Sequence, residues 1–174
     1  MRADMRRTVA WIDVDARRHS YAFRAYMQAV AHARYVFRKV HRIVDECARS
    51  HGLEPLQHQA LIQINATADG ALAVGHLADR LSVAPALASR LVRQLGAQGL
   101  VLRSRSQTDG RTIHVSITAE GEDRLYAIVQ GAHERVHDFR LSLAPEEREA
   151  THEIASFYVG SDRAGAGKAA AARR

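Results

Sequence analysis

The chain has 174 residues, 47% of them hydrophobic, a net charge of +6 and a pI near 10.1. This length and apolar share suit one ordinary domain that folds without disulfide bonds, and the single cysteine, Cys47, has no partner for an internal one. No early apolar run is long enough for a signal peptide or a membrane span, so we expect a cytoplasmic protein without a membrane partner.

The charge is unevenly distributed along the chain. Residues 71–118 contain six arginines and two aspartates, a net charge of +4, whereas residues 119–160 contain nine acidic residues and four arginines, a net charge of −5. This change of sign suggests that one face of the protein meets phosphate and that another region has a different role. The alternative is a solvated surface whose charge is merely uneven.

A long helix is the first predicted element, and it follows a polar, arginine-rich N-terminal extension over residues 1–20. Apolar residues recur with three- and four-residue spacing from Tyr21 to Ser50, as they do along one side of an α-helix. Within the extension, Trp11 and Ile12 are candidates for a short additional helix.

Three shorter helices are predicted next. Proline is tolerated at the first helical position, so Pro55 opens the first of them, which ends at "ATADG". Residues 71–100 then predict two helices separated by a tight turn at residues 81–84, with Pro85 at the start of the second. Small Ala78 near the turn allows the two helices to cross closely, as a helix-turn-helix requires.

A β-hairpin is predicted directly after the helix pair. "LVLRSR" predicts a short strand, and an Asp-Gly turn within residues 106–110 joins it to a second strand. In that second strand Ile113, Val115 and Ile117 alternate with polar residues, which is the two-residue period of a half-buried strand. We expect this apolar face to pack on the two helices just before it.

Two further helices and a tail complete the predicted order. Thr118 is a suitable N-cap for a helix over about residues 119–141, and "APEERE" begins a last helix that reaches about residue 160. Residues 161–174 are small, glycine-rich and basic, and we expect a disordered basic tail. The predicted buried stripe of the first of these helices is Leu125, Ile128, Val129, Ala132, Val136 and Phe139.

A helix-turn-helix followed at once by a hairpin is the order of a winged helix, and the long helices on both sides can serve as a dimerisation frame. In this order and spacing, the chain over roughly residues 25–160 resembles the MarR family of bacterial transcriptional regulators. The segments that carry the resemblance are "GLEPLQHQALIQI" (Gly52 to Ile64), "VGHLADRLSVAPALASRLVRQLGAQGLVLR" (Val74 to Arg103), "DGR" (Asp109 to Arg111) and "VSITAEG" (Val115 to Gly121).

The resemblance implies a mainly α (α+β) fold. The MarR-like domain would cover residues 21–160, with a winged helix-turn-helix over about residues 53–118 and dimerisation helices over about 21–50 and 119–160. It also implies a homodimeric, sequence-specific DNA-binding regulator, without a cofactor or catalytic residues, that represses from a pseudo-palindromic operator and responds to a small ligand. Such a protein would be bacterial and would associate with the nucleoid when bound.

One residue departs from the family pattern. The position before Pro85, where the family usually has Ser or Thr, is Ala84. The predicted recognition helix therefore lacks a side-chain cap worth about 1 kcal/mol. Nearby Ser82 is a candidate to replace it, although its spacing is not ideal.

The candidate DNA-binding residues of the recognition helix are those that remain when its apolar stripe is removed. The major groove admits one helix, where arginine can pair with guanine or phosphate, glutamine can pair with adenine or phosphate, and a short serine allows close approach. The residues are Ala86, Ser89, Arg90, Arg93 and Gln94. The alternative is a solvated helix face.

The wing supplies the other candidate DNA-binding residues. Arg111 has the fork geometry that suits a narrow, negative minor groove, and Asp109 would hold an arginine in position rather than touch DNA. The resemblance assigns these two residues to the same roles. Arg103 and Arg105 are candidates for additional phosphate contacts.

An effector site is implied by the resemblance alone. Similar proteins bind small aromatic or phenolic anions in a cleft between the dimer frame and the winged helix. Tyr35, Arg38, His41 and His58 are the candidate lining residues, with Arg38 facing a carboxylate. The alternative is that they are ordinary surface residues of the helices.

The single cysteine and the histidines suggest other functions. The family includes peroxide sensors whose reactive cysteine lies near the start of the first long helix, but Cys47 lies near its end and continues the apolar spacing, which favours a buried thiol. His133 and His137 are four residues apart without a completing metal-ligand set, so no metal site is predicted. Three alternatives remain: an enzyme with a site among the histidines, a winged helix that contacts only proteins, and a redox- or metal-responsive regulator that acts through Cys47 or through His133 and His137.

Overall fold

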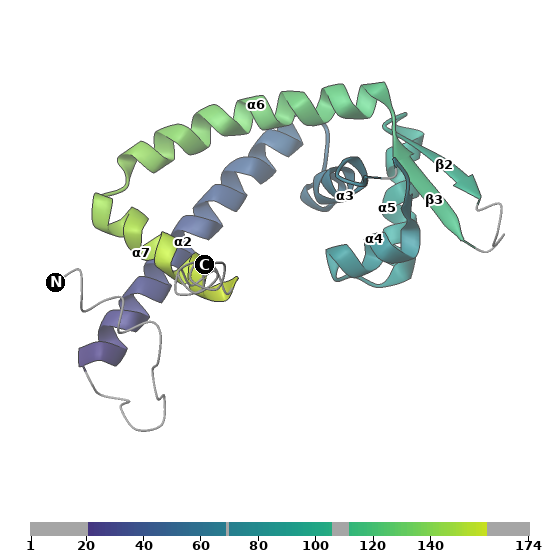
Figure 1. Cartoon of the computed structure of the whole chain (residues 1–174). Coiled ribbons are helices and arrows are strands. Elements are labelled where there is room, and N and C mark those ends of the chain that lie inside the picture. Colours follow the sequence, from purple (N-terminus) through teal and green to yellow (C-terminus); the bar gives the residue numbers. More distant parts are fainter. Residues whose placement is uncertain (1–20, 69, 106–111, 160–174) are drawn as a thin grey trace, which may run out of the picture. The chain divides into compact units, whose positions relative to one another are not determined.

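The structure is a computed structural model that describes residues 21–68, 70–105 and 112–159. It is mainly helical with one small sheet, which confirms the predicted fold class (Figure 1). Among the described residues, no helix is long and apolar enough to cross a bilayer. The elements are α2 (Tyr21–Ser50), α3 (Pro55–Asn65), β1 (Leu72–Ala73), α4 (Val74–Leu81), α5 (Pro85–Ala97), β2 (Val101–Arg105), β3 (Ile113–Ile117), α6 (Ala119–Ser142) and α7 (Pro145–Tyr158).

The chain divides into two compact units. We call residues Arg42–Val136 the winged-helix unit, and the described residues up to His41 and from His137 onward the frame unit. The helices α2 and α6 each contribute to both units.

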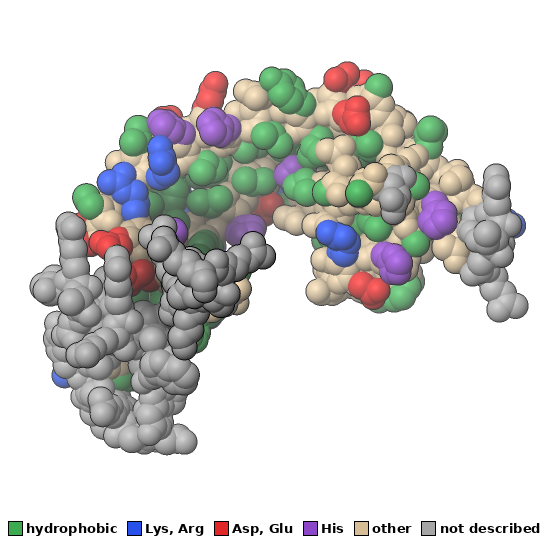
Figure 2. Space-filling view, in the orientation of Figure 1, with side chains coloured by type: hydrophobic (Ala, Val, Ile, Leu, Met, Phe, Trp, Pro, Cys, Tyr) green, Lys and Arg blue, Asp and Glu red, His purple; other side chains and the backbone are tan. Residues whose placement is uncertain are grey.

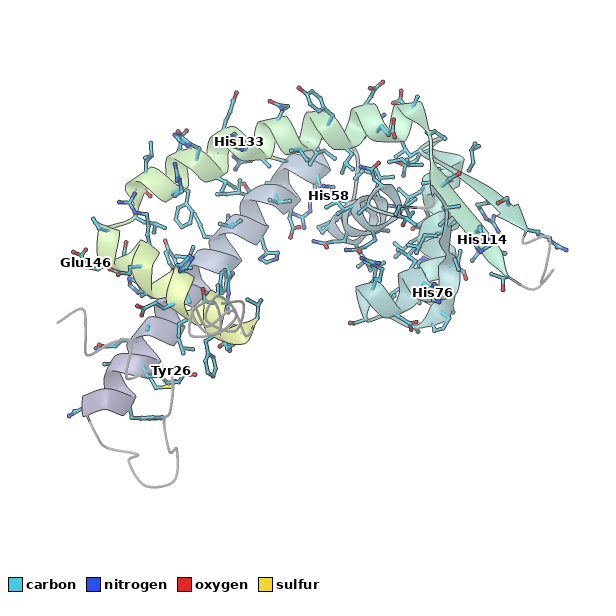
Figure 3. All side chains as sticks on the ribbon, viewed as in Figure 1. Tyr26, His58, His76, His114, His133 and Glu146 are labelled. Atoms are coloured by element: carbon cyan, nitrogen blue, oxygen red, sulfur yellow. The ribbon has the colours of Figure 1, made fainter. Side chains whose placement is uncertain are left out.

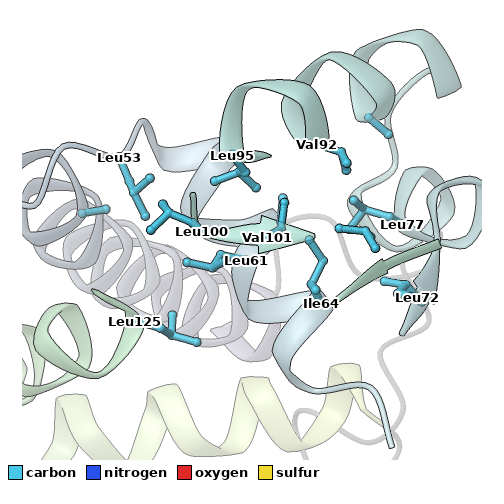
Figure 4. Packing of buried hydrophobic residues seen from close by; sticks show 14 of the residues in the cluster. Leu53, Leu61, Ile64, Leu72, Leu77, Val92, Leu95, Leu100, Val101 and Leu125 are labelled. Atoms are coloured by element: carbon cyan, nitrogen blue, oxygen red, sulfur yellow. The ribbon is translucent and has the colours of Figure 1, made fainter. Parts of the chain in front are cut away.

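The core of the winged-helix unit is built from every element of that unit. Leucines and other apolar side chains from α3, α4, α5, the sheet and α6, together with Cys47 and Ala48 of α2, form one buried cluster (Figure 4). Val115 is fully buried in it, and Ile113 and Ile117 pack against it from the same face of β3. The prediction that this face of the strand packs on the preceding helices is confirmed.

The sheet has three antiparallel strands in the order β1-β3-β2. The central strand β3 pairs with β2 over five residues and with the two-residue strand β1 through Leu72 opposite Val115. The sequence pattern did not predict β1, since two residues are too few to show an alternation. β1 leads directly into α4 and so ties the helix-turn-helix to the wing.

Hydrogen bonds of Thr118 connect the start of α6 to the turn between α5 and β2. The Thr118 hydroxyl accepts the N–H of Gly121 (3.1 Å) and donates to the Gly99 carbonyl (2.7 Å), while the Thr118 N–H donates to the Leu100 carbonyl (3.1 Å). Thr118 therefore caps α6 as predicted, and it also fixes where β3 ends.

The buried stripe of α6 differs in part from its prediction. Leu125, Ile128 and Ala132 are buried, and Val136 and Phe139 are partly buried. Val129, however, is 51% exposed, and Tyr126, three residues before it, is 66% exposed. Figure 2 shows hydrophobic side chains on the exposed surface of α6. Because Val129 directly follows Ile128 on the helix, it turns away from the side that faces the core.

The frame unit has a small core. Among the described residues, its buried cluster consists of Ala29 and Ala33 of α2 with Ala150 and Ile154 of α7. The His32 Nε2 of α2 lies 2.7 Å from the Glu147 Oε1 of α7.

Glu147 also stabilises the start of α7. Its other carboxylate oxygen accepts the N–H of Ala144, the residue that precedes the helix. This backbone hydrogen bond and, second, the contact with His32 lower the pKa of Glu147.

Replacing Gly121 with alanine should destabilise the winged-helix unit. An added Cβ would lie far inside contact distance of the Leu100 carbonyl oxygen and 2.8 Å from a side-chain carbon of Ile117. We expect a loss of about 1–3 kcal/mol in the free energy of unfolding, measured with urea, because overpacking outweighs the better helix propensity of alanine.

Gly131→Ala, on the same helix, is the matched control for this steric effect. Its Cβ would lie 3.9 Å from the Cys47 Sγ, an ordinary contact. This variant should be as stable as the parent or more stable, by up to about 1 kcal/mol. Equal losses in the two variants would contradict the steric explanation.

Candidate nucleic-acid interface

The helix α5 presents one polar face to solvent. Ala88, Leu91, Val92 and Leu95 are buried against the rest of the winged-helix unit. Residues on the opposite side of a helix recur three and four positions apart, and these are exposed. The exposed residues on this face are Ala86, Ser89, Arg90 and Arg93.

The start of α5 lacks a side-chain cap. Ala84 has the extended backbone of an N-cap residue and makes no side-chain cap hydrogen bond, and Pro85 follows at the first helical position. Ser82 ends α4 with a left-handed backbone, φ +53°, so it serves as the C-cap of α4 and not as a cap of α5. The first turn of α5 therefore retains N–H groups for which no side chain supplies an acceptor.

A cavity of about 230 Å³ lies between α5 and the wing. Arg93 and Ser89 of α5 line it together with Arg103 of β2. Arg103 pairs with Val115 in the sheet and therefore points to the α5 side of β2, where its Cδ lies beside Gly96. The other lining residues are apolar: Val74, Val92 and Ile113. A cavity with two guanidinium groups and a hydroxyl suits an anion such as a phosphate.

Two more of the candidate residues lie at the edge of this interface. Arg105 is exposed on β2, two residues beyond Arg103 and on the same side of the strand. Gln94 is only partly exposed, and its Oε1 accepts a hydrogen bond from the Nε2 of Gln57 on α3 (3.4 Å). Gln57 is 7% exposed and was not among the predicted site residues. Asp109 and Arg111 lie outside the described residues.

The four candidate effector residues fall in different units. Tyr35, Arg38 and His41 are exposed on the frame-unit part of α2, where Tyr35 makes an edge contact with Phe139 and the His41 Nδ1 lies 2.8 Å from a backbone carbonyl. His58 belongs to the winged-helix unit. The structure thus describes no site made from all four residues.

His58 lies on α3 and is labelled in Figure 3. It is 2% exposed, and neither ring nitrogen has a hydrogen-bond partner among the described residues. This burial lowers the pKa of His58 from its ordinary value of 6.5, against a smaller opposing effect of Asp45. The imidazole is therefore held in the core in its neutral form.

Cys47 is buried, 4% exposed, at the end of α2. Its Sγ accepts a hydrogen bond from the Arg135 guanidinium (3.4 Å), which also binds Glu46. The hydrogen bonds from Arg135 and, second, Arg42 lower the pKa of Glu46.

His133 and His137 are exposed on α6, and Figure 3 labels His133 there. In the described part of the chain, no group of three or more His, Cys, Asp or Glu side chains is arranged to hold a metal ion.

Comparison with known proteins agrees with this geometry. Residues 51–112 match the model of the MarR family. A curated relative is the HTH-type transcriptional repressor MdtR of Bacillus subtilis (strain 168), which is 26% identical over 96 residues. That match spans 55% of this chain and 61% of the relative, so the chain covers about three fifths of the relative's length.

Two solved structures share the fold. The YusO protein of Bacillus subtilis has a TM-score of 0.61 with 21% identity, covering 82% of this chain and 100% of that one. A mutant MarR from E. coli complexed with operator DNA has a TM-score of 0.58 with 20% identity, covering 71% of this chain and 87% of that one. At these identities the likeness concerns the fold.

Burial of neutral His58 should make folding stability depend on pH. In the unfolded chain His58 binds a proton near pH 6.5, whereas in the folded protein burial lowers its pKa. The contribution of neutral His58 to folding stability is therefore complete above pH 6.5 and is lost as the pH falls through the lowered pKa of the folded state. We expect the free energy of unfolding to fall between neutral and mildly acidic pH, and His58→Leu to reduce that fall. His133→Leu, at an exposed position, is the control; an equal reduction in both variants would contradict this role of His58.

Proposed function

We propose that this chain is a winged helix-turn-helix regulator of the MarR family, whose model matches residues 51–112, and that it regulates transcription by binding duplex DNA through the exposed face of α5. The observation that carries this proposal is the group of Ser89, Arg93 and Arg103 around one cavity beside α5, with Arg90 exposed on the same face. The activity is binding and release of DNA, without a catalytic step.

The proposed contacts divide between two grooves of the duplex. The exposed face of α5 would lie in the major groove, where Arg90 and Arg93 pair with guanine or with phosphate. Arg103 and Arg105 would hold the backbone beside it. We propose that Arg111 enters the minor groove and that Asp109 keeps an arginine in position.

The frame unit supports a homodimer. Among the described residues, its buried cluster contains three alanines and one isoleucine, and Tyr26, Val30 and Phe37 pack against it while only partly buried. Other large apolar side chains of the same unit are exposed. A second copy of the chain would cover them. The exposed residues are Met27, Tyr35, Leu141, Phe157, Tyr158 and Val159.

Dimerisation would place two copies of α5 on a pseudo-palindromic operator, with half-sites about one helical turn apart. The name of MdtR supports a repressor. A small aromatic or phenolic anion would act by favouring a spacing of the two α5 helices that does not fit the half-sites. The proposed effector residues remain Tyr35, Arg38, His41 and His58. Of the four, buried His58 has the least surface with which to contact a ligand directly.

DNA binding is tested by footprinting on the DNA upstream of the gene at fixed salt. Wild-type protein should protect two half-sites, and Arg93→Ala should weaken binding about tenfold. The slope of log binding constant against log salt concentration should become less steep by about 0.9 for each phosphate contact that the substitution removes. Arg148→Ala, an exposed arginine on α7, should bind as the wild type does. If the wild type shows no salt-dependent affinity for duplex DNA, the winged helix serves another role, such as protein contacts.

Dimerisation is tested by sedimentation of a charged variant of the frame unit. Leu141→Glu places a carboxylate on an exposed apolar position and should raise the dissociation constant of the dimer at least about tenfold. Leu102→Glu, the same change at a 64% exposed leucine of β2, should leave the dimer intact. A monomeric wild type, or equal effects of the two variants, would contradict the proposed interface.

A further inference from the structure

Gln57 is a buried polar side chain whose orientation is fixed. Its Oε1 accepts the backbone N–H of Glu54 (3.0 Å) in the capping box that begins α3. A backbone N–H can only donate, so this bond identifies which end of the Gln57 carboxamide is the oxygen. The NH2 group therefore points to the other partner of Gln57.

That partner is Gln94 on α5. The Gln57 Nε2 lies 3.4 Å from the Gln94 Oε1. Two NH2 groups facing each other would both lack an acceptor, so Gln94 must turn its oxygen to α3 and its NH2 group elsewhere. Gln94 follows Arg90 by one turn, at the edge of the exposed face of α5.

We propose that Gln57 is a positioning residue that makes Gln94 a hydrogen-bond donor to DNA. The Gln94 NH2 group donates to an acceptor of the duplex, which is either a phosphate oxygen or an acceptor atom on a base edge. This inference rests on the proposed function and deepens it. It also excludes two-bond pairing of Gln94 with adenine, because that pairing needs both the oxygen and the NH2 group of the glutamine on the same base.

The decisive variant is Gln57→Glu. Its carboxylate still accepts the Glu54 N–H, but its second oxygen now faces α5 as an acceptor, so the Gln94 amide reverses and presents its oxygen to DNA. We expect binding to weaken about tenfold, because an acceptor then faces an acceptor. Gln59→Glu adds the same charge to α3 and should leave binding unchanged, and thermal melting shows whether each variant is folded.

The double variant separates positioning from a change in the fold. In a Gln94→Met background there is no amide to reverse, so Gln57→Glu should not weaken binding further. Gln94→Met itself should weaken binding several-fold through the lost donor. If Gln57→Glu costs as much in this background as in the wild type, or if Gln94→Met binds as the wild type does, the inference is wrong.

Two DNA samples show whether the acceptor belongs to a phosphate or to a base. One sample contains duplexes that the wild type selects from a random pool, and the other contains unselected duplexes from the same pool. An equal loss for Gln94→Met on both samples identifies a phosphate, and a loss on the selected duplexes alone identifies a base. Either result supports a donor role for Gln94.

A measurement without DNA distinguishes failure of this inference from failure of the proposed function. In nitrogen-15 NMR spectra of the free protein, Gln57→Glu should shift the side-chain NH2 resonances of Gln94, and Gln59→Glu should not. Unchanged Gln94 resonances would overturn the positioning role even if the wild type binds DNA. A wild type that binds neither DNA sample would overturn the donor role together with the proposed function, whatever the spectra show.

Discussion

Burial of one face of α5 is the constraint on which the proposed interface depends. Val92 and Leu95 belong to the winged-helix core, and Leu91 is buried as well. Removing side chains of this size from water stabilises the fold by roughly 1.5–3 kcal/mol each. With that face fixed, the geometry of a helix leaves Arg90 and Arg93 no direction other than outward. The core therefore decides which residues are available to meet DNA.

The wing depends on the same core. Val115 of the central strand is fully buried, and the register of β2 against β3 then places Arg103 on the side of the sheet that faces α5. The hydrogen bonds of the Thr118 hydroxyl, and the close approach of Gly121 to Leu100 and Ile117, hold the end of β3 against the start of α6. The helix α5 and the strand β2, which follows it directly in the chain, thereby contribute arginines to one cavity.

Features with a regular period could be predicted from the sequence, and those that depend on single tertiary contacts could not. The three- and four-residue spacing of α5 predicted its exposed side, and the alternation of β3 predicted its buried face. The strand β1 was missed because two residues show no period. Neither the hydrogen bond of Gln57 to Gln94 nor the burial of His58 has a local signal, since each arises only when α3 packs on its neighbours.

The most direct test of the central claim is cleavage of duplex DNA by an iron chelate attached to a single cysteine on the exposed face of α5, at Ala86→Cys in a Cys47→Ala background. We expect two clusters of cuts, one in each half-site, with centres about one helical turn apart. The same chelate at His152→Cys, an exposed position on α7, should give none. Cuts from position 152 without cuts from position 86 would contradict the claim that this face of α5 reads DNA.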